Sequence, residues 1–105
     1  MLHTEVEVTM PIQVKQVNAL KRTEIVAGQA VQYRYQLWAA LTSGGQPYYW
    51  ISVYRSTGAA GQEELAISPL LGREPAMAWQ LLQRLAEGLV SPIHLVDIVR
   101  DWLVS

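Results

Sequence analysis

Apolar and polar residues alternate with a period of two at the start of the chain. The apolar positions share one parity and are Val6, Val8, Met10, Ile12 and Val14. Successive side chains of a strand point to opposite faces, so this spacing predicts a half-buried β-strand. Pro11 lies within it and lacks a backbone donor, so we expect the strand to lie at a sheet edge or to break there.

The same period returns after a polar stretch. Residues 18–24 are mostly polar and predict a connection rather than a strand. Residues 31–41 predict a second strand, because large or apolar side chains occupy one parity. That face carries Val31, Tyr33, Tyr35, Leu37, Ala39 and Leu41. Gly28, just before this strand, is typical of a turn or a bulge.

Two further strands follow, each after a turn signal. Residues 42–47, with the sequence Thr-Ser-Gly-Gly-Gln-Pro, predict a turn. Residues 48–55 are rich in aromatic and β-branched side chains and predict a third strand. Residues 56–62 contain two glycines and predict another turn, and residues 64–68 predict a short fourth strand. The pattern indicates a meander of about four antiparallel strands.

The hydrophobic period changes after Pro69. Over residues 74–87, apolar side chains recur at the spacing of one helix face, at Met77, Ala78, Leu81, Leu82 and Leu85. Pro75 suits the first turn of a helix, and Gly88 suits its C-terminal cap.

A second helix is predicted to begin at Ser91 and Pro92, an N-cap followed by proline at the first helical position. Its apolar stripe is expected to be buried; it consists of Leu95, Ile98, Val99 and Trp102, widened by Val96 and Leu103.

These elements predict an α+β fold: an antiparallel β-meander of about four strands, with two C-terminal helices packed on one face. We expect one domain over residues 1–105, with the sheet at about 1–68 and a helical hairpin at about 73–104. The sheet face under the helices is expected to carry Val6, Tyr33, Leu37, Ile51 and Val53.

Composition narrows the expected functions. Half of the residues are hydrophobic, 16% are charged and the formal net charge is −1, so neither nucleic acid nor an anionic membrane is an expected partner. The chain has no cysteine, which excludes thiol nucleophiles and thiolate metal sites. The first residues lack the pattern of a secretory signal, and no apolar run is long enough to span a membrane. The expected location is therefore cytoplasmic.

His94, Asp97 and Asp101 are the side chains that most resemble a reactive cluster, because i, i+3 and i+7 share one helix face. A histidine with a carboxylate is the composition of a general-base pair or of two metal ligands. A solvated polar helix face explains the same residues and is the favoured interpretation. We therefore predict no catalytic, cofactor-binding or metal-binding residue and no cofactor.

The aromatic side chains of the sheet are the strongest functional lead. If odd-numbered positions form the core, Trp38, Tyr48, Trp50 and Tyr54 lie with Arg34 on the opposite face. Trp, Tyr and Arg are the usual anchors of protein interfaces. Stacked aromatics beside an arginine are also typical of sites for ring-bearing ligands or single-stranded nucleic acid. Alternatively, other parts of the chain cover this face.

The C-terminal half carries a resemblance. Its features are the strand YYWISVYR, the step ELAIS and the tail pattern G-x-x-SP-x-HL-x-D-x-V-x-D-x-L, all within residues 48–103. This arrangement resembles a family of short uncharacterised bacterial proteins, a domain of unknown function. The resemblance implies no activity and supplies no site residue.

Together these observations favour a small non-enzymatic protein-interaction module that binds an unidentified protein or a second copy of itself as a homodimer. The alternative is a small-ligand-binding or minor enzymatic domain that uses the same aromatic face.

Overall fold

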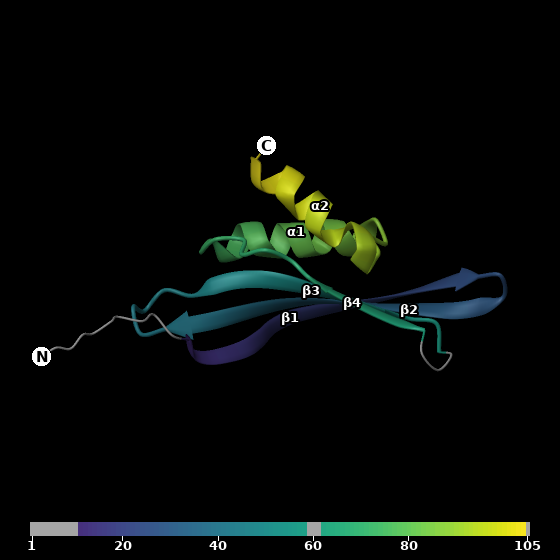
Figure 1. The fold of residues 1–105 in the computed structure, drawn as a ribbon, viewed down its shortest axis with the longest axis horizontal. Coiled ribbons are helices and arrows are strands. Elements are labelled where there is room, and N and C mark those ends of the chain that lie inside the picture. The colour runs from purple at the N-terminus through teal and green to yellow at the C-terminus, as the bar shows by residue number, and fades with distance from the viewer. Residues whose placement is uncertain (1–10, 59–61, 105) are drawn as a thin grey trace, which may run out of the picture.

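The computed structural model describes residues 11–58 and 62–104. Its elements are β1 (Pro11–Val26), β2 (Gln29–Thr42), β3 (Tyr48–Ser56), β4 (Glu63–Ile67), α1 (Pro75–Glu87) and α2 (Pro92–Val104). The strands form an antiparallel sheet in chain order, and both helices lie on one face of it (Figure 1). The predicted α+β fold is confirmed. The predicted strand positions Val6, Val8 and Met10 lie outside the described residues.

The prediction of a polar connection at residues 18–24 is wrong, because these residues belong to β1. They pair with β2 from Asn18, opposite Leu37, to Glu24, opposite Val31. The strands are joined by a two-residue turn at Ala27 and Gly28, whose φ angles are 51° and 80°. Positive φ at both positions is the geometry of a type I′ hairpin turn, which matches the twist of the paired strands. The polar residues form a strand because β2 supplies their backbone partners.

A register shift between Gln16 and Asn18 interrupts the alternation of β1. Beyond the shift, Leu20 lies opposite Tyr35 and packs against the core under the helices. Before it, Val14 lies opposite Ala40 and is 52% exposed on the other face of the sheet. A β-bulge reverses the face that each later residue occupies. The sequence pattern had suggested that Val14 lies on the buried face. The structure places it on the opposite, exposed face.

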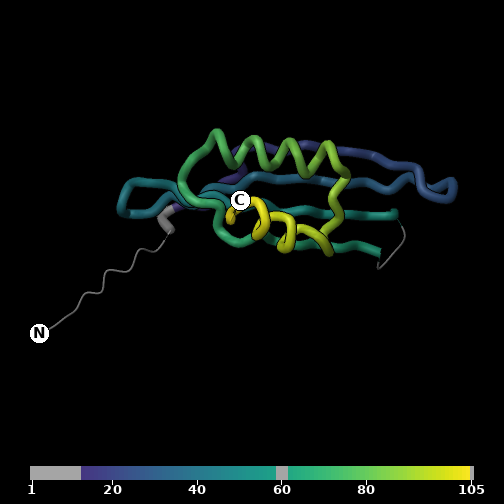
Figure 2. Tube along the Cα trace, turned by 90° about the horizontal axis from the view of Figure 1, so that it is seen from above, coloured from purple at the N-terminus to yellow at the C-terminus, as the bar shows by residue number. Residues whose placement is uncertain are grey.

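The two helices cover different strands. α1 lies over β1, β2 and β3, and α2 lies over β3 and β4 (Figure 2). Toward its C-terminal end α2 rises away from the sheet (Figure 1). Leu95 and Val99 are therefore fully buried, whereas Ile98 is 37% and Leu103 is 42% exposed. The buried stripe of α2 is therefore narrower than the stripe predicted from the sequence.

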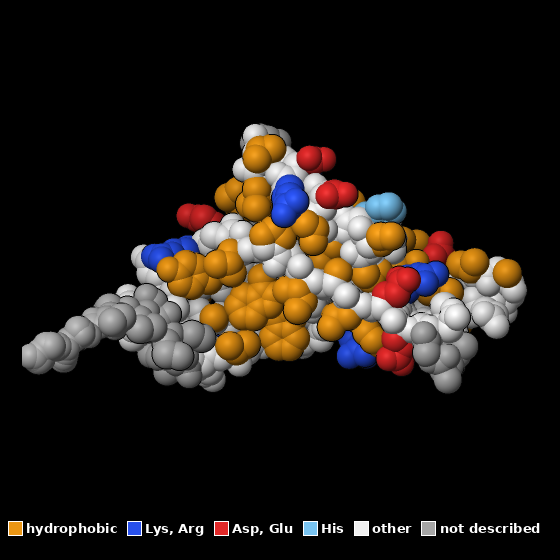
Figure 3. Space-filling view, in the orientation of Figure 1, with side chains coloured by type: hydrophobic (Ala, Val, Ile, Leu, Met, Phe, Trp, Pro, Cys, Tyr) orange, Lys and Arg blue, Asp and Glu red, His pale blue; other side chains and the backbone are white. Residues whose placement is uncertain are grey.

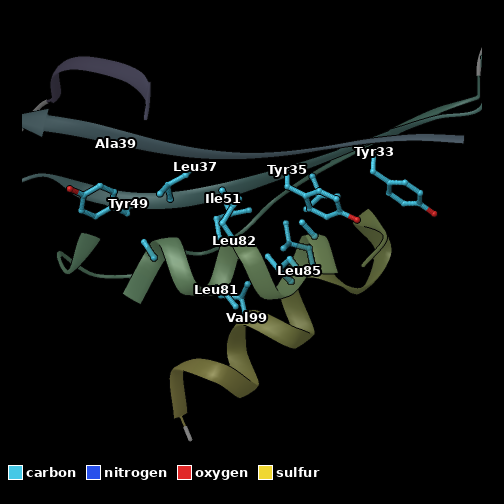
Figure 4. Packing of buried hydrophobic residues seen from close by; sticks show 14 of the residues in the cluster. Tyr33, Tyr35, Leu37, Ala39, Tyr49, Ile51, Leu81, Leu82, Leu85 and Val99 are labelled. Carbon is cyan, nitrogen blue, oxygen red and sulfur yellow. The ribbon is translucent and has the colours of Figure 1, made fainter. Parts of the chain in front are cut away.

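The core lies between the helices and one face of the sheet (Figure 4). The sheet side of this core includes the expected Tyr33, Leu37, Ile51 and Val53, all at most 6% exposed. The helix side is lined by aliphatic residues that are at most 1% exposed, namely Leu81, Leu82, Leu85, Leu95 and Val99. This apolar contact holds the helices on the sheet.

Two hydrogen bonds from the sheet fix the end of α1 and the corner that follows. The Arg22 guanidinium donates to the Ala86 carbonyl at 2.7 Å, and the Tyr35 hydroxyl donates to the Val90 carbonyl at 2.9 Å. Gly88 is the C-cap, as expected, but the left-handed residue is Leu89, with φ 51°. The Leu89 side chain packs against the core, which offsets the backbone cost of this conformation.

Two groups on the covered face have raised pKa values. Burial raises the pKa of Tyr35 above its ordinary value of about 10, because ionisation would place a charge in the core. The pKa of Arg55 is raised because its guanidinium donates to the Tyr33 hydroxyl at 3.3 Å. The Tyr33 hydroxyl in turn donates to Glu24 at 3.1 Å, and Arg55 pairs with Glu64 at 3.8 Å. These contacts tie β1 to β4 across β2 and β3.

Candidate interaction surface

The face of the sheet opposite the helices, which we call the open face, consists of rows of side chains that cross the strands. Trp38 lies opposite Trp50 in one row. In the next row toward the β1–β2 turn, Gln36, Ser52 and Ile67 follow one another on β2, β3 and β4, and the row after that is Arg34, Tyr54 and Leu65. Neither helix covers this face (Figure 1).

The centre of the open face is a shallow apolar depression of about 310 Å³. It is lined by side chains of all four strands: Val14, Gln36, Trp38, Trp50, Ser52, Leu65 and Ile67. Leu65 is 62% and Ile67 is 58% exposed, and both tryptophans are half-buried. Hydrophobic side chains also gather over the sheet, below the helical layer, in Figure 3. A contiguous exposed apolar patch of this kind is typical of a binding surface.

The polar atoms inside the depression bond one another. The Trp38 indole donates to the Ser52 hydroxyl at 2.9 Å, and that hydroxyl donates to the Gln36 carbonyl oxygen at 3.1 Å. The Gln36 amide then donates to Gln16 at 2.6 Å. This chain of hydrogen bonds fixes the orientation of Trp38 and leaves an apolar surface above it.

One end of the open face is cationic. Lys21 on β1 lies directly opposite Arg34 on β2, and both side chains are exposed. The Arg34 guanidinium lies over the Tyr54 ring, with its central carbon 4.7 Å from the ring centroid. Within the described ranges, neither cation forms an ion pair with a carboxylate. An open cavity of about 350 Å³ borders both side chains and Tyr54.

The structure places all five side chains of the predicted interaction patch on the open face, but it divides them into three places. Trp38 and Trp50 line the depression, and Arg34 and Tyr54 stack beside it. Tyr48 lies at the other end, under the Arg73 guanidinium, which donates a short hydrogen bond to the Tyr48 hydroxyl. Whether this surface binds a partner stays a prediction.

Sequence reasoning missed six residues of this surface: Val14, Lys21, Gln36, Ser52, Leu65 and Ile67. Leu65 and Ile67 could have been found, because they alternate with Ala66, which packs on the core side. Lys21 was hidden within the stretch assigned to a connection, and Val14 was placed on the wrong face because the register shift is not visible in the sequence.

The possible reactive cluster of the C-terminal helix does not assemble. His94, Asp97 and Asp101 are all exposed on α2. Among the described residues, no three histidine or carboxylate side chains lie close enough together to hold a metal ion. The backbone amide of His94 donates to the Ser91 carbonyl at 3.0 Å, so this residue takes part in the first turn of the helix.

Comparisons with known proteins give one match. Residues 14–105 match the model of a family described as "Family of unknown function (DUF6514)". No curated protein and no solved structure matches the chain. Neither described helix is long and apolar enough to cross a membrane. The family model covers most of the chain, from β1 to the end of α2, and confirms the expected membership of a family of unknown function. The chain therefore belongs to the DUF6514 family.

Proposed function

We propose that this protein is a small non-enzymatic protein-interaction module that binds its partner through the open face. The observation that carries this proposal is the exposed apolar depression around Trp38 and Trp50, on a sheet whose other face is already buried by the helices. Burial of exposed apolar surface drives most protein association, and tryptophan is among the residues that contribute most at interfaces.

The hydrogen bonds within the depression favour a protein partner over a small ligand or substrate. Small-molecule sites present a few polar groups that orient the ligand. Here the polar groups of Trp38, Ser52 and Gln36 already bond one another. What remains exposed is broad, shallow and apolar, which is suited to side chains of another protein.

The proposal is tested by matched substitutions on the two sides of the molecule. Ile67→Ala removes apolar surface from the open face, and Ile98→Ala removes the same groups from the exposed side of α2. Wild type, both variants and Trp50→Ala are used as baits in extract of the cells that express the protein, and the retained proteins are quantified. Partners should be retained by wild type and Ile98→Ala and be lost with Ile67→Ala and Trp50→Ala.

Two further measurements complete the test. Light scattering at tens of micromolar shows whether a second copy is a partner, in which case Ile67→Ala should return the protein to a monomer. Thermal melting shows whether Trp50→Ala still unfolds cooperatively near the wild-type temperature. A sharp fall in melting temperature would identify Trp50 as a core residue and contradict the proposal, as would equal retention of partners by all four proteins.

A further inference from the structure

The two like charges at the cationic end of the open face lower the stability of the fold. Lys21 and Arg34 are direct cross-strand neighbours on the same face. Like charges in this position destabilise a sheet, and a carboxylate next to them would remove the repulsion. The structure shows no such carboxylate in ion-pair contact with either side chain, within the residues it describes. The pair therefore has an unused capacity to bind an anion.

The surroundings of this pair suit a carboxylate. Arg34 is held over the Tyr54 ring, so its guanidinium is partly fixed before any ligand arrives. A planar guanidinium matches the two oxygens of a carboxylate, and the neighbouring lysine adds a second donor. Tyr54 also lies opposite Leu65, which lines the apolar depression. The cationic pair and the depression are thus adjacent parts of one surface.

Building on the proposed function, we propose that Lys21 and Arg34 bind an aspartate or glutamate carboxylate of an acidic partner segment, while a large apolar side chain of that segment occupies the depression that Trp38 and Trp50 line. The partner is thus defined by its chemistry: an acidic and apolar protein segment.

The spacing of the two parts restricts the partner further. Arg34 and Trp38 are four residues apart on β2, a separation of about 13 Å along the strand. An extended segment that runs along β2 would place the carboxylate about four residues from the apolar side chain. On one face of a helical segment, the spacing that comes nearest to this distance is seven or eight residues, a rise of about 11–12 Å.

Charge argues against a second copy packed with its own open face on this one. Among the strand residues that the structure describes, Glu63 is the one carboxylate that shares this face, in register with Ser56. Two such faces packed with their cationic ends together would juxtapose two Lys21–Arg34 pairs with a single glutamate each. Repulsion between them disfavours this dimer, whereas an acidic partner gains from the same charges.

The experiment selects short random peptides displayed on phage against the full chain, with Trp50→Ala as the counter-selection. Peptides that require the open face should pair a large apolar residue with aspartate or glutamate at one of the two spacings. One enriched peptide is then synthesised with its acidic residue intact or replaced by the amide, and its affinity is measured by fluorescence anisotropy.

Lys21→Gln/Arg34→Gln should weaken binding of the acidic peptide by roughly 2- to 30-fold, the range for two exposed ion pairs. The double variant should leave the affinity for the amide peptide unchanged. The loss from the protein substitutions and the loss from the amide replacement are then not additive, as expected for groups in direct contact. Lys15→Gln/Arg100→Gln removes the same charge elsewhere and should leave the affinity within about twofold. The first double variant should fold at least as well as the second, because it relieves a repulsion.

Five results would overturn this inference. If the selected peptides lack acidic residues, or if both double variants weaken binding equally, the carboxylate site is absent while the proposed function stands. A dimer that Ile67→Ala abolishes would identify a second copy as the occupant. Binding of a single-stranded oligonucleotide that depends on Lys21 and Arg34 would identify a phosphate site. If no peptide distinguishes wild type from Trp50→Ala and the protein is monomeric, the proposed function fails as well.

Discussion

Removal of one hydroxyl tests how the corner between the helices is held. Tyr35 is fully buried, and its hydroxyl donates to the Val90 carbonyl at 2.9 Å. Tyr35→Phe keeps the ring and its apolar contacts and deletes this hydrogen bond alone. Loss of such a bond, with the acceptor left behind, costs about 1–2 kcal/mol of the free energy of unfolding. In a domain of this size that cost lowers the melting temperature by roughly 5–10 °C.

The same hydroxyl predicts a dependence of stability on alkaline pH. Burial raises the pKa of Tyr35 above its ordinary value of about 10. Below that pH the hydroxyl is protonated in both states and contributes no pH dependence. Above it the unfolded chain loses the proton while the folded chain keeps it, so stability falls by up to about 1.4 kcal/mol per pH unit. Tyr35→Phe should remove this contribution.

Urea unfolding, followed by far-ultraviolet circular dichroism near neutral pH and just above pH 10, measures both effects. Tyr49→Phe is the matched control, because Tyr49 is 8% exposed on the same face and its hydroxyl has no hydrogen bond among the described residues. The reasoning is refuted if the two variants lose equal stability near neutral pH, or if Tyr35→Phe keeps the full alkaline loss of the wild type.

Three more substitutions test other parts of the structure by the same urea assay. Leu82→Ala opens a cavity at a fully buried position of α1 and should cost about 3–5 kcal/mol, against about 1 kcal/mol or less for Ile98→Ala; equal costs would contradict the assignment of the core. Gly28→Ala forces alanine into a left-handed turn position and should cost about 1–2 kcal/mol, whereas Gly44→Ala, at ordinary φ, should be nearly neutral. Arg22→Met removes the guanidinium from the carbonyl end of α1 and should cost about 1–2 kcal/mol and speed amide exchange there; unchanged exchange would show that the hydrogen bond does not hold the helix end.

The elements with a buried face could be predicted from the sequence. β2, β3 and both helices have one side against the core, and burial imposes a period that the residues display. The second half of β1 has no such period, because it is an edge strand whose side chains are mostly exposed on both faces. Its one clear signal was the Ala27-Gly28 turn, which fixes the register from the turn as far as the pair of Asn18 and Leu37.

For the candidate surface, the sequence predicted which residues of β2 and β3 share a face. It did not predict which residues of β1 lie beside them. The even-numbered positions of β2 and β3 placed the tryptophans and Arg34 on one face, as the structure does. That Lys21 lies beside Arg34 follows only from the pairing of β1 with β2. That Val14 joins the depression follows from a bulge that no residue in the sequence marks.

The irregularities of β1 also bear on how the edge of the sheet resists pairing with further chains. An apolar face next to a sixteen-residue edge strand offers a template on which further chains could add as strands and grow into fibrils. Two register shifts interrupt that edge, and the charged side chains of Lys15 and Lys21 lie along it. Both features oppose regular strand addition. The edge thus restrains aggregation by strand addition and leaves the proposed binding to the open face.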